Sequence, residues 1–222
     1  MGTVLLQMLP LALGSIAPAM IGAVILFLST TNGLVKSIAF VVGKFLAYLL
    51  WGFVLLALAG HISSTNPKST GIASAVLYVL LGVVLLIFAV KTFFGEDDPD
   101  APPPKIMVML DKMGAGKLFV AGFLLSIPQL RFIGLLVIGV TIITSAAISP
   151  AQTIISVFVL DLIMIWTLLI PIIVFLVMGE RRDAAMKSMR EWLNRHQRIV
   201  NVVVLGFFGL AILIKGLSII FG

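Results

Sequence analysis

Six long apolar segments constrain this chain more than any other feature of its sequence. A helix needs about 20 apolar residues to cross the hydrocarbon core of a bilayer. Six segments reach that length: residues 2–28, 37–60, 71–94, 118–145, 150–178 and 199–221. Lipid offers no partner to backbone N–H and C=O groups, so each segment must be helical. The sequence therefore predicts an all-α, polytopic membrane protein with six transmembrane helices.

The composition excludes several classes of function. Hydrophobic residues make up 61% of the 222 and charged residues 11%, whereas soluble domains carry about a quarter charged residues. A soluble enzyme is thereby excluded. The chain has no cysteine and two histidines, which leaves no set of metal ligands. Without a nucleophile–base pair or a phosphate loop, we expect no enzymatic activity, no catalytic residue, no metal and no cofactor.

The distribution of Lys and Arg predicts the orientation in the membrane. The first, third and fifth loops carry ten of them, and the second and fourth loops carry one, Lys68. Basic loops stay in the cytoplasm, so we expect a multi-pass plasma-membrane protein with both termini on the non-cytoplasmic side. The net charge of +6 is explained by this topology, and no nucleic-acid partner is expected. Residues 1–35 contain no Lys or Arg, so the first segment is interpreted as a retained span and not as a signal peptide.

A break in composition divides the chain into two halves. Residues 95–117 begin with an acidic run and contain three successive prolines, Pro102 to Pro104, which favour a solvated cytoplasmic linker. The linker separates a first three-helix repeat, residues 1–94, from a second, residues 118–222. Within the second repeat, residues 180–198 form a basic amphipathic segment. We expect it to lie on the cytoplasmic face against anionic headgroups, although the positive-inside rule alone would explain most of its charge.

The first span of each half contains a serine shortly before a proline: Ser15 and Pro18 in one, Ser126 and Pro128 in the other, where Gln129 follows. Three spans per half force the second half to insert upside down. Inverted repeats with broken helices are typical of secondary transporters with a midplane site. The sequence thus predicts a 3+3 inverted repeat. The alternative is that the prolines only kink their helices while Ser15, Ser126 and Gln129 bond to the freed carbonyls.

Three charged residues lie inside or beside the apolar segments. Asp161 is deep in the fifth, Lys44 lies in the second, and Arg131 follows the proline of the fourth. An unpaired charge at this depth costs about 2.5–3.5 kcal/mol, so Asp161 needs a partner, a proton or a cavity. We predict that it pairs with Lys44 across the repeat axis, with Arg131 as the second possible partner. The alternatives are a purely structural ion pair and a lysine that extends to the interface.

Short motifs resemble a known family of exporters. The sequence Ser15-Ile16-Ala17-Pro18 and the later Phe40-Val41-Val42-Gly43 resemble the LysE-type exporter superfamily. The nearest resemblance is to its mycobacterial lipid-addressing branch, the glycopeptidolipid- and sulfolipid-addressing (GAP) proteins. This resemblance implies a plasma-membrane protein that exports a cell-envelope lipid or glycolipid, or assists its translocation. The second half, with Ser126 to Arg131, departs from the asparagine-proline motif of the family, so substrate and residue roles there stay open.

Three functions therefore remain in competition. The first is a lipid or glycolipid exporter with a site between the repeats, in which Asp161 and a basic partner act in gating or proton coupling. The second is an exporter of an amino acid or small cation. The third is an accessory subunit of a larger lipid-export complex that moves nothing itself. Membrane lipids are expected partners in each case. Ala39, Gly43 and Ala47 form a ridge of small residues that would allow a homodimer, although packing within the chain is the favoured interpretation.

Overall fold

The computed structural model describes residues 1–65, 67–95, 109–110, 113–127, 130–146 and 148–221. All regular elements in these ranges are helices. In chain order they are α1 (Gly2–Gly14), α2 (Pro18–Leu28), α3 (Gly33–Thr65), α4 (Pro67–Phe94), α6 (Ala115–Leu124), α7 (Leu130–Thr144), α8 (Pro150–Val177), the short 3₁₀ helix η1 (Gly179–Arg181) and α9 (Arg182–Phe221). The predicted all-α class is confirmed.

Three of these helices, α3, α8 and α9, are long and apolar enough to cross a bilayer alone. The pair α1–α2 makes a fourth span if the bent pair is counted as one. Helices α6 and α7 are each too short to cross a bilayer alone. The apolar part of α4 among the described residues, Tyr78–Phe94, is also short. The structure therefore supports a membrane protein with several spans, while the number six stays a prediction.

The first span is broken where the sequence predicts it. Helix α1 ends at Gly14, α2 begins at Pro18, and the two are bent by 75°. Proline has no N–H to donate, and it forces the preceding residue out of the helical region. Ala17 accordingly adopts φ −127° and ψ 86°. The interruption near Pro18 is confirmed, and its cause is local.

The predicted fourth span is interrupted as well. Helix α6 ends at Leu124, and the next three residues form a turn in which Ser126 N and Ile127 N donate to carbonyls three residues back. Helix α7 begins at Leu130. Pro128 and Gln129, on which the prediction also rested, lie outside the described residues.

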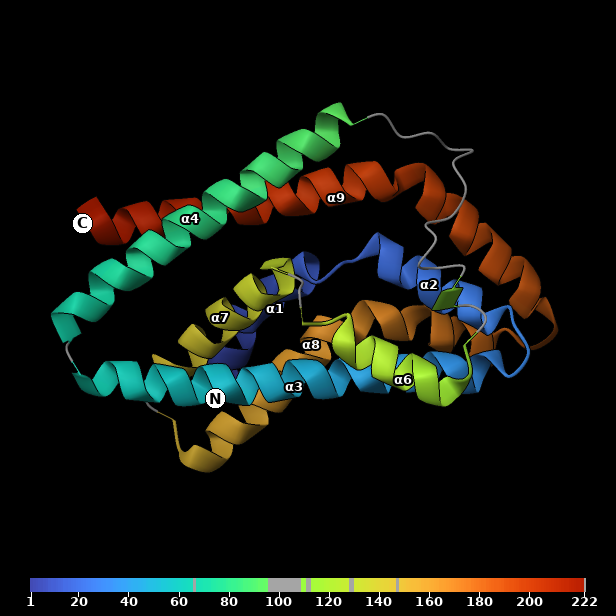
Figure 1. Cartoon of the computed structure of the whole chain (residues 1–222), viewed down its shortest axis with the longest axis horizontal. Helices are drawn as coiled ribbons and strands as arrows, with labels where there is room; N and C mark the ends of the chain where they lie inside the picture. Colours follow the sequence, from blue (N-terminus) through green and yellow to red (C-terminus); the bar gives the residue numbers. More distant parts are fainter. Residues whose placement is uncertain (66, 96–108, 111–112, 128–129, 147, 222) are drawn as a thin grey trace.

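The helices pack in two close pairs around a central one. Figure 1 shows α4 and α9 together along one edge, α3 beside α6 toward the opposite edge, α1 and α7 between the two pairs, and α8 crossing α3. Glycines allow the closest contacts. A Cβ added to Gly43 would lie 2.1 Å from the carbonyl oxygen of Phe119, and one added to Gly122 would lie 2.2 Å from that of Phe40. The ridge containing Gly43 thus packs against α6 of the same chain, as favoured.

Helix α8 contacts α1, α2, α3, α7 and α9, and its buried face contributes much of the core. It begins with a capping box in which Ser149 and Gln152 bond reciprocally through side chain and backbone. Because α8 contacts both the broken first span and α3, polar groups on its buried face are held at the centre of the molecule.

Candidate functional site

Lys44 and Asp161 lie at equal distances from the first residues of their helices. Each follows the first residue of its helix, Gly33 or Pro150, by eleven positions. At a rise of 1.5 Å per residue this places both about 17 Å from a helix end. The hydrocarbon core is about 30 Å thick, so a bilayer that matches these helices would hold both residues near its midplane.

Lys44 is buried in a cage of aromatic rings, with 1% of its surface exposed. Its Nζ lies 5.9, 5.1 and 5.8 Å from the ring centroids of Phe40, Tyr48 and Phe132. It also donates a hydrogen bond of 3.1 Å to Ser126 Oγ. Ring faces attract a cation and partly replace its hydration. The cage therefore explains how a lysine is held far from water, and the alternative of an amine extended to the interface is wrong in this structure.

The serine of each helix break bonds to a backbone carbonyl that the break leaves free, and Ser15 also lies within hydrogen-bond distance of a carbonyl of α8. Ser126 Oγ donates to Gly122 O at 2.7 Å. Ser15 Oγ lies 2.9 Å from both Ala12 O and Ile163 O, and its single proton serves one of them at a time. Ile163 belongs to α8, so Ser15 fastens the first break to the central helix.

Trp166 completes this contact, and sequence analysis did not single it out. Its Nε1 donates to Ala12 O at 2.9 Å and lies 3.1 Å from Ser15 Oγ. A tryptophan N–H inside a span needs an acceptor, but the sequence does not indicate which carbonyl will be free. Each break serine thus lies within hydrogen-bond distance of a long side chain from the other half of the chain. Ser126 is next to Lys44 of α3, and Ser15 is next to Trp166 of α8.

We expect Trp166→Phe to loosen the first break. The change keeps an aromatic ring but leaves Ala12 O with at most the Ser15 hydroxyl as a donor. Interhelical hydrogen bonds in membranes contribute about 0.6–2 kcal/mol, so a drop of about 1 kcal/mol in the free energy of unfolding is expected, measured by denaturation in detergent micelles. Trp51→Phe is the control, because no hydrogen bond of its ring nitrogen occurs among the described contacts. Equal stability of Trp166→Phe and wild type would contradict the role of this bond.

Asp161 is buried with 1% of its surface exposed, and neither carboxylate oxygen has a hydrogen-bond partner among the described residues. The predicted ion pair with Lys44 is not formed in this structure, where the Lys44 amine bonds to Ser126. Arg131 occupies the second position of α7, and its side chain lies outside the described residues. An unpaired carboxylate at this depth requires a proton or a ligand.

The register of α3 and α8 places Asp161 close to Lys44 along the helix. The two helices are antiparallel. Lys44, which comes earlier in α3 than Gly52, shares a crevice with Leu168, whereas Gly52 meets Val157, which comes earlier in α8 than Leu168. Asp161 follows Val157 by four residues and so lies at the level of Tyr48, four residues before Gly52. About one helical turn of α3 therefore separates the level of Asp161 from that of Lys44.

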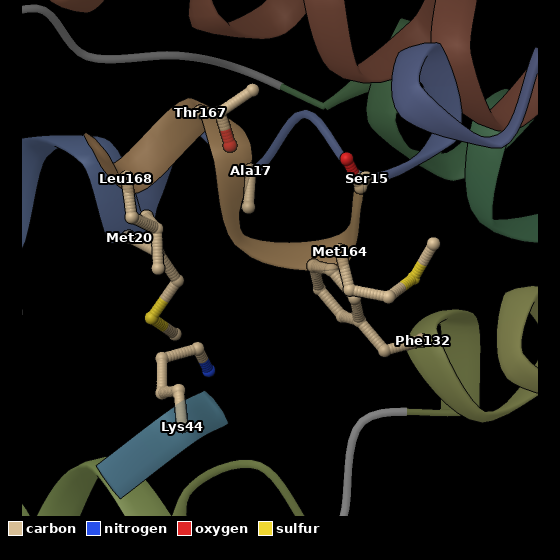
Figure 2. Close-up of a pocket in the computed structure, with 8 residues that line it drawn as sticks. All are labelled: Ser15, Ala17, Met20, Lys44, Phe132, Met164, Thr167 and Leu168. Carbon is tan, nitrogen blue, oxygen red and sulfur yellow. The ribbon is translucent and has the colours of Figure 1, made fainter. Parts of the chain in front are cut away.

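One narrow crevice brings these elements together (Figure 2). Side chains from the first break, α2, α3, α7 and α8 surround about 170 Å³ of empty space, none of it wide enough to admit a water molecule. The lining residues are Ser15, Ala17, Met20, Lys44, Phe132, Met164, Thr167 and Leu168. Asp161 does not line it but shares a face of α8 with Met164 and Leu168, three and seven residues on. The crevice is thus closed and mainly apolar, with Lys44 at its edge.

The family model of Sap, the sulfolipid-1-addressing protein, matches residues 8–218, nearly the whole chain. The chain belongs to this family. The resemblance to the lipid-addressing branch is thereby confirmed, while membership of the wider LysE-type superfamily stays a prediction. Comparison with curated proteins and with solved structures finds no match. The Sap family is one of membrane proteins associated with lipid, and it gives no sign of catalysis.

The Sap-family match assigns no role to individual residues. Their contacts in the structure indicate which of them act together. Of the candidates predicted from sequence, Lys44, Ser126 and Ser15 meet at or beside one crevice. Pro18 begins the helix that borders it. Thr167, which lines it, has a hydroxyl without a hydrogen-bond partner in the part of the chain that the structure describes. In the described part of the chain no three His, Asp or Glu side chains gather as metal ligands would.

The basic segment of this Sap-family protein differs from expectation. Residues 182–198 belong to the same helix as the last span, α9. Met186 and Leu193, on its apolar side, are buried within the protein, and Leu193 contacts the position of Gly22 in α2. This apolar face therefore packs against protein and not against headgroups. Arg198 donates to the carbonyl of Phe93 at the end of α4.

Proposed function

We propose that this Sap-family protein is a plasma-membrane transporter that moves a cell-envelope lipid or glycolipid through a midplane site between two inverted repeats. One observation carries the proposal. A single crevice joins the break of the first span, through Ser15, to Lys44, which bonds the break of the fourth at Ser126. The unpaired carboxylate of Asp161 lies about one turn away. Helix breaks and buried charges at one midplane point are typical of transport sites.

The packing pattern supports an inverted repeat of residues 1–94 and 118–222, joined by the linker 95–117. A two-fold operation would exchange α1–α2 with α6–α7, α3 with α8, and α4 with α9. Helix α3 packs against α6 and α7, and its counterpart α8 packs against α1 and α2, while α4 pairs with α9. The two-fold operation turns the contacts of α3 with α6 and α7 into those of α8 with α1 and α2, and it leaves the pair of α4 and α9 unchanged. A superposition of the two halves about an axis in the membrane plane tests the proposal.

Contacts between loops support six spans with both termini on the non-cytoplasmic side. Thr30 and Asn32, in the first loop, line the same cavity as Arg182, which follows the fifth span. Arg198, further along α9, bonds to Phe93 at the end of α4. The first and fifth loops therefore meet at one end of the molecule, and the end of the third span contacts the basic segment that follows the fifth loop. This is the arrangement that a six-span chain with cytoplasmic odd-numbered loops requires.

A movement of the Lys44 side chain would couple the charge on Asp161 to the helix break at Ser126. In this structure its amine bonds to Ser126 at the second break. In a second state it would pair with Asp161 and release Ser126, so that the break could move. Only a charged Asp161 would attract the amine, and a proton on Asp161 would favour the Ser126 contact. Protonation at one residue would thereby control a helix break on a neighbouring span.

The lining of the crevice favours an amphiphile over a small polar solute. Its apolar wall is formed by five of the lining residues, and Lys44 supplies the charge; the five are Ala17, Met20, Phe132, Met164 and Leu168. An exporter of an amino acid or small cation needs a water-filled cavity at its site, and this crevice does not admit water. An accessory subunit of a lipid exporter, by contrast, would keep the crevice packed shut at all times.

Labelling of Thr167→Cys distinguishes a transporter from an accessory subunit. The chain has no cysteine, and Thr167 lines the crevice while only 3% exposed. If the crevice opens during a transport cycle, a membrane-impermeant maleimide should label this cysteine in cells. The rate should exceed that of Val140→Cys at least tenfold, because Val140 is equally buried on α7 but does not line the crevice.

Labelling of Thr167→Cys no faster than that of Val140→Cys would contradict transport through this crevice and favour the accessory role. A fast reaction at both positions would show that the protein is loosened as a whole, which would also contradict a specific opening. Each variant is compared at matched membrane abundance.

A further inference from the structure

A second and larger cavity lies at one end of the bundle, away from the crevice. Its volume is about 450 Å³, and it is open to the surroundings. It is lined by the end of α2, the first loop, the start of α3, and the turn between α8 and α9: Leu28, Ser29, Thr30, Asn32, Gly33, Leu34, Val35, Phe175, Arg182 and Asp183. Helix α2 runs from Pro18 at the crevice to Leu28 at this cavity. The two spaces are therefore about 15 Å apart along the helix axis.

The cavity presents one positive and one negative group. The Arg182 guanidinium lies 5.1 Å from the ring centroid of Phe175, which fixes its position. Its Nε is 4.0 Å from Asp183 Oδ1, and the two side chains are 54% and 89% exposed. Exposed pairs at this distance are held weakly. The Arg182 guanidinium and the Asp183 carboxylate can therefore give up their contact with each other, and each can bind a group of an external ligand.

Further polar groups and an apolar stripe adjoin these charges. Thr30 Oγ1 accepts a hydrogen bond from Lys36 Nζ at 3.1 Å, so the Lys36 ammonium lies next to a hydroxyl that lines the cavity. Val35 lines the cavity and is 59% exposed. It begins a row of exposed residues on one side of α3, spaced three and four apart, that continues with Ile38, Val42 and Leu46. Such a row provides a surface for an acyl chain.

We propose that this cavity binds a membrane phospholipid whose head group carries both a phosphate and a primary ammonium, as in phosphatidylethanolamine. Arg182 would hold the phosphate in a charge-assisted pair, and Asp183 would hold the ammonium. One acyl chain would lie along Val35 and the row that follows it. The site is separate from the midplane crevice and does not depend on the proposed transport.

Competition between two lipids tests the head-group assignment. The full-length protein is purified in detergent with equal amounts of phosphatidylethanolamine and phosphatidylglycerol of identical acyl chains, and retained lipid is counted by native mass spectrometry. Wild type should retain phosphatidylethanolamine at least fivefold better. Arg182→Gln should reduce that retention at least fivefold. Asp183→Asn removes the ammonium partner and a negative charge, so it should shift the preference toward phosphatidylglycerol.

Arg190→Gln and Glu191→Gln are the matched controls, because both residues are exposed on α9 and neither lines the cavity. They should leave the preference unchanged. Equal retention of the two lipids by wild type, or an unaltered preference in Asp183→Asn, would overturn the proposal. Soluble phosphoethanolamine at the lipid's concentration should not displace it. Equal displacement would show that the free compound suffices, which overturns the assignment to a lipid.

Discussion

Asp161→Asn is expected to reduce export at least tenfold while membrane abundance stays at the wild-type level. Asparagine has nearly the same shape as aspartate but cannot become negatively charged, so it cannot draw Lys44 away from Ser126. Both oxygens of Asp161 lack hydrogen-bond partners in the structure, so no native bond is lost. The measurement is the amount of envelope glycolipid at the surface of cells that carry the variant in place of the wild-type chain.

Ser156→Ala provides the control for this prediction. Ser156 is also fully buried on α8, and its hydroxyl also has no partner, but it carries no charge. We expect its export to equal that of wild type. Wild-type export by Asp161→Asn would remove Asp161 from the functional residues. A parallel loss of abundance and export would assign it a structural role only.

The helix breaks could be predicted because their cause lies within a few residues of sequence. Pro18 removes one backbone donor and forces Ala17 into an extended conformation, whatever surrounds them. The hydroxyls of Ser15 and Ser126 then find the nearest freed carbonyls, three or four residues back. The sequence also placed Asp161 and Lys44 inside apolar segments, and the structure buries both side chains.

The partners of the buried charges could not be predicted, because they depend on how neighbouring helices are rotated and offset. Repeat symmetry suggested that Lys44 meets Asp161, yet the close approach of α3 to α6 directs its amine to Ser126. The indole of Trp166 reaches Ala12 O across 154 positions of sequence. No local pattern contains such a contact.

The basic segment shows a different limit. The spacing of Met186 and Leu193 correctly indicates a helix with one apolar face. Hydrophobic spacing alone does not distinguish a face that meets lipid from one that meets protein. Here the neighbour is α2, where Gly22 leaves room for the Leu193 side chain. The last span was predicted to begin at Ile199, but the basic segment continues into it without a break.

Close packing of α3 against α6 ties the fold to the candidate site. Apolar side chains gain little by leaving lipid for a protein interior, so membrane helices associate through tight backbone contact at small residues. Gly43 and Gly122 provide that contact reciprocally. Gly43 precedes Lys44, and Gly122 O accepts the hydrogen bond of Ser126. The approach that joins the two helices is therefore the same one that brings Lys44 Nζ to within 3.1 Å of Ser126 Oγ.

For this reason Gly43→Val should be the most damaging single substitution in the transmembrane region. Its Cβ would lie 2.1 Å from Phe119 O, and a backbone atom cannot rotate away as a side chain can. We expect a loss of about 3 kcal/mol or more, seen as a fall of at least tenfold in folded protein extracted from membranes. Gly206→Val is the control, since nothing lies within 4 Å of a Cβ there. Normal abundance of Gly43→Val would mean that α3 and α6 need not touch, and the placement of Lys44 beside Ser126 would then require another explanation.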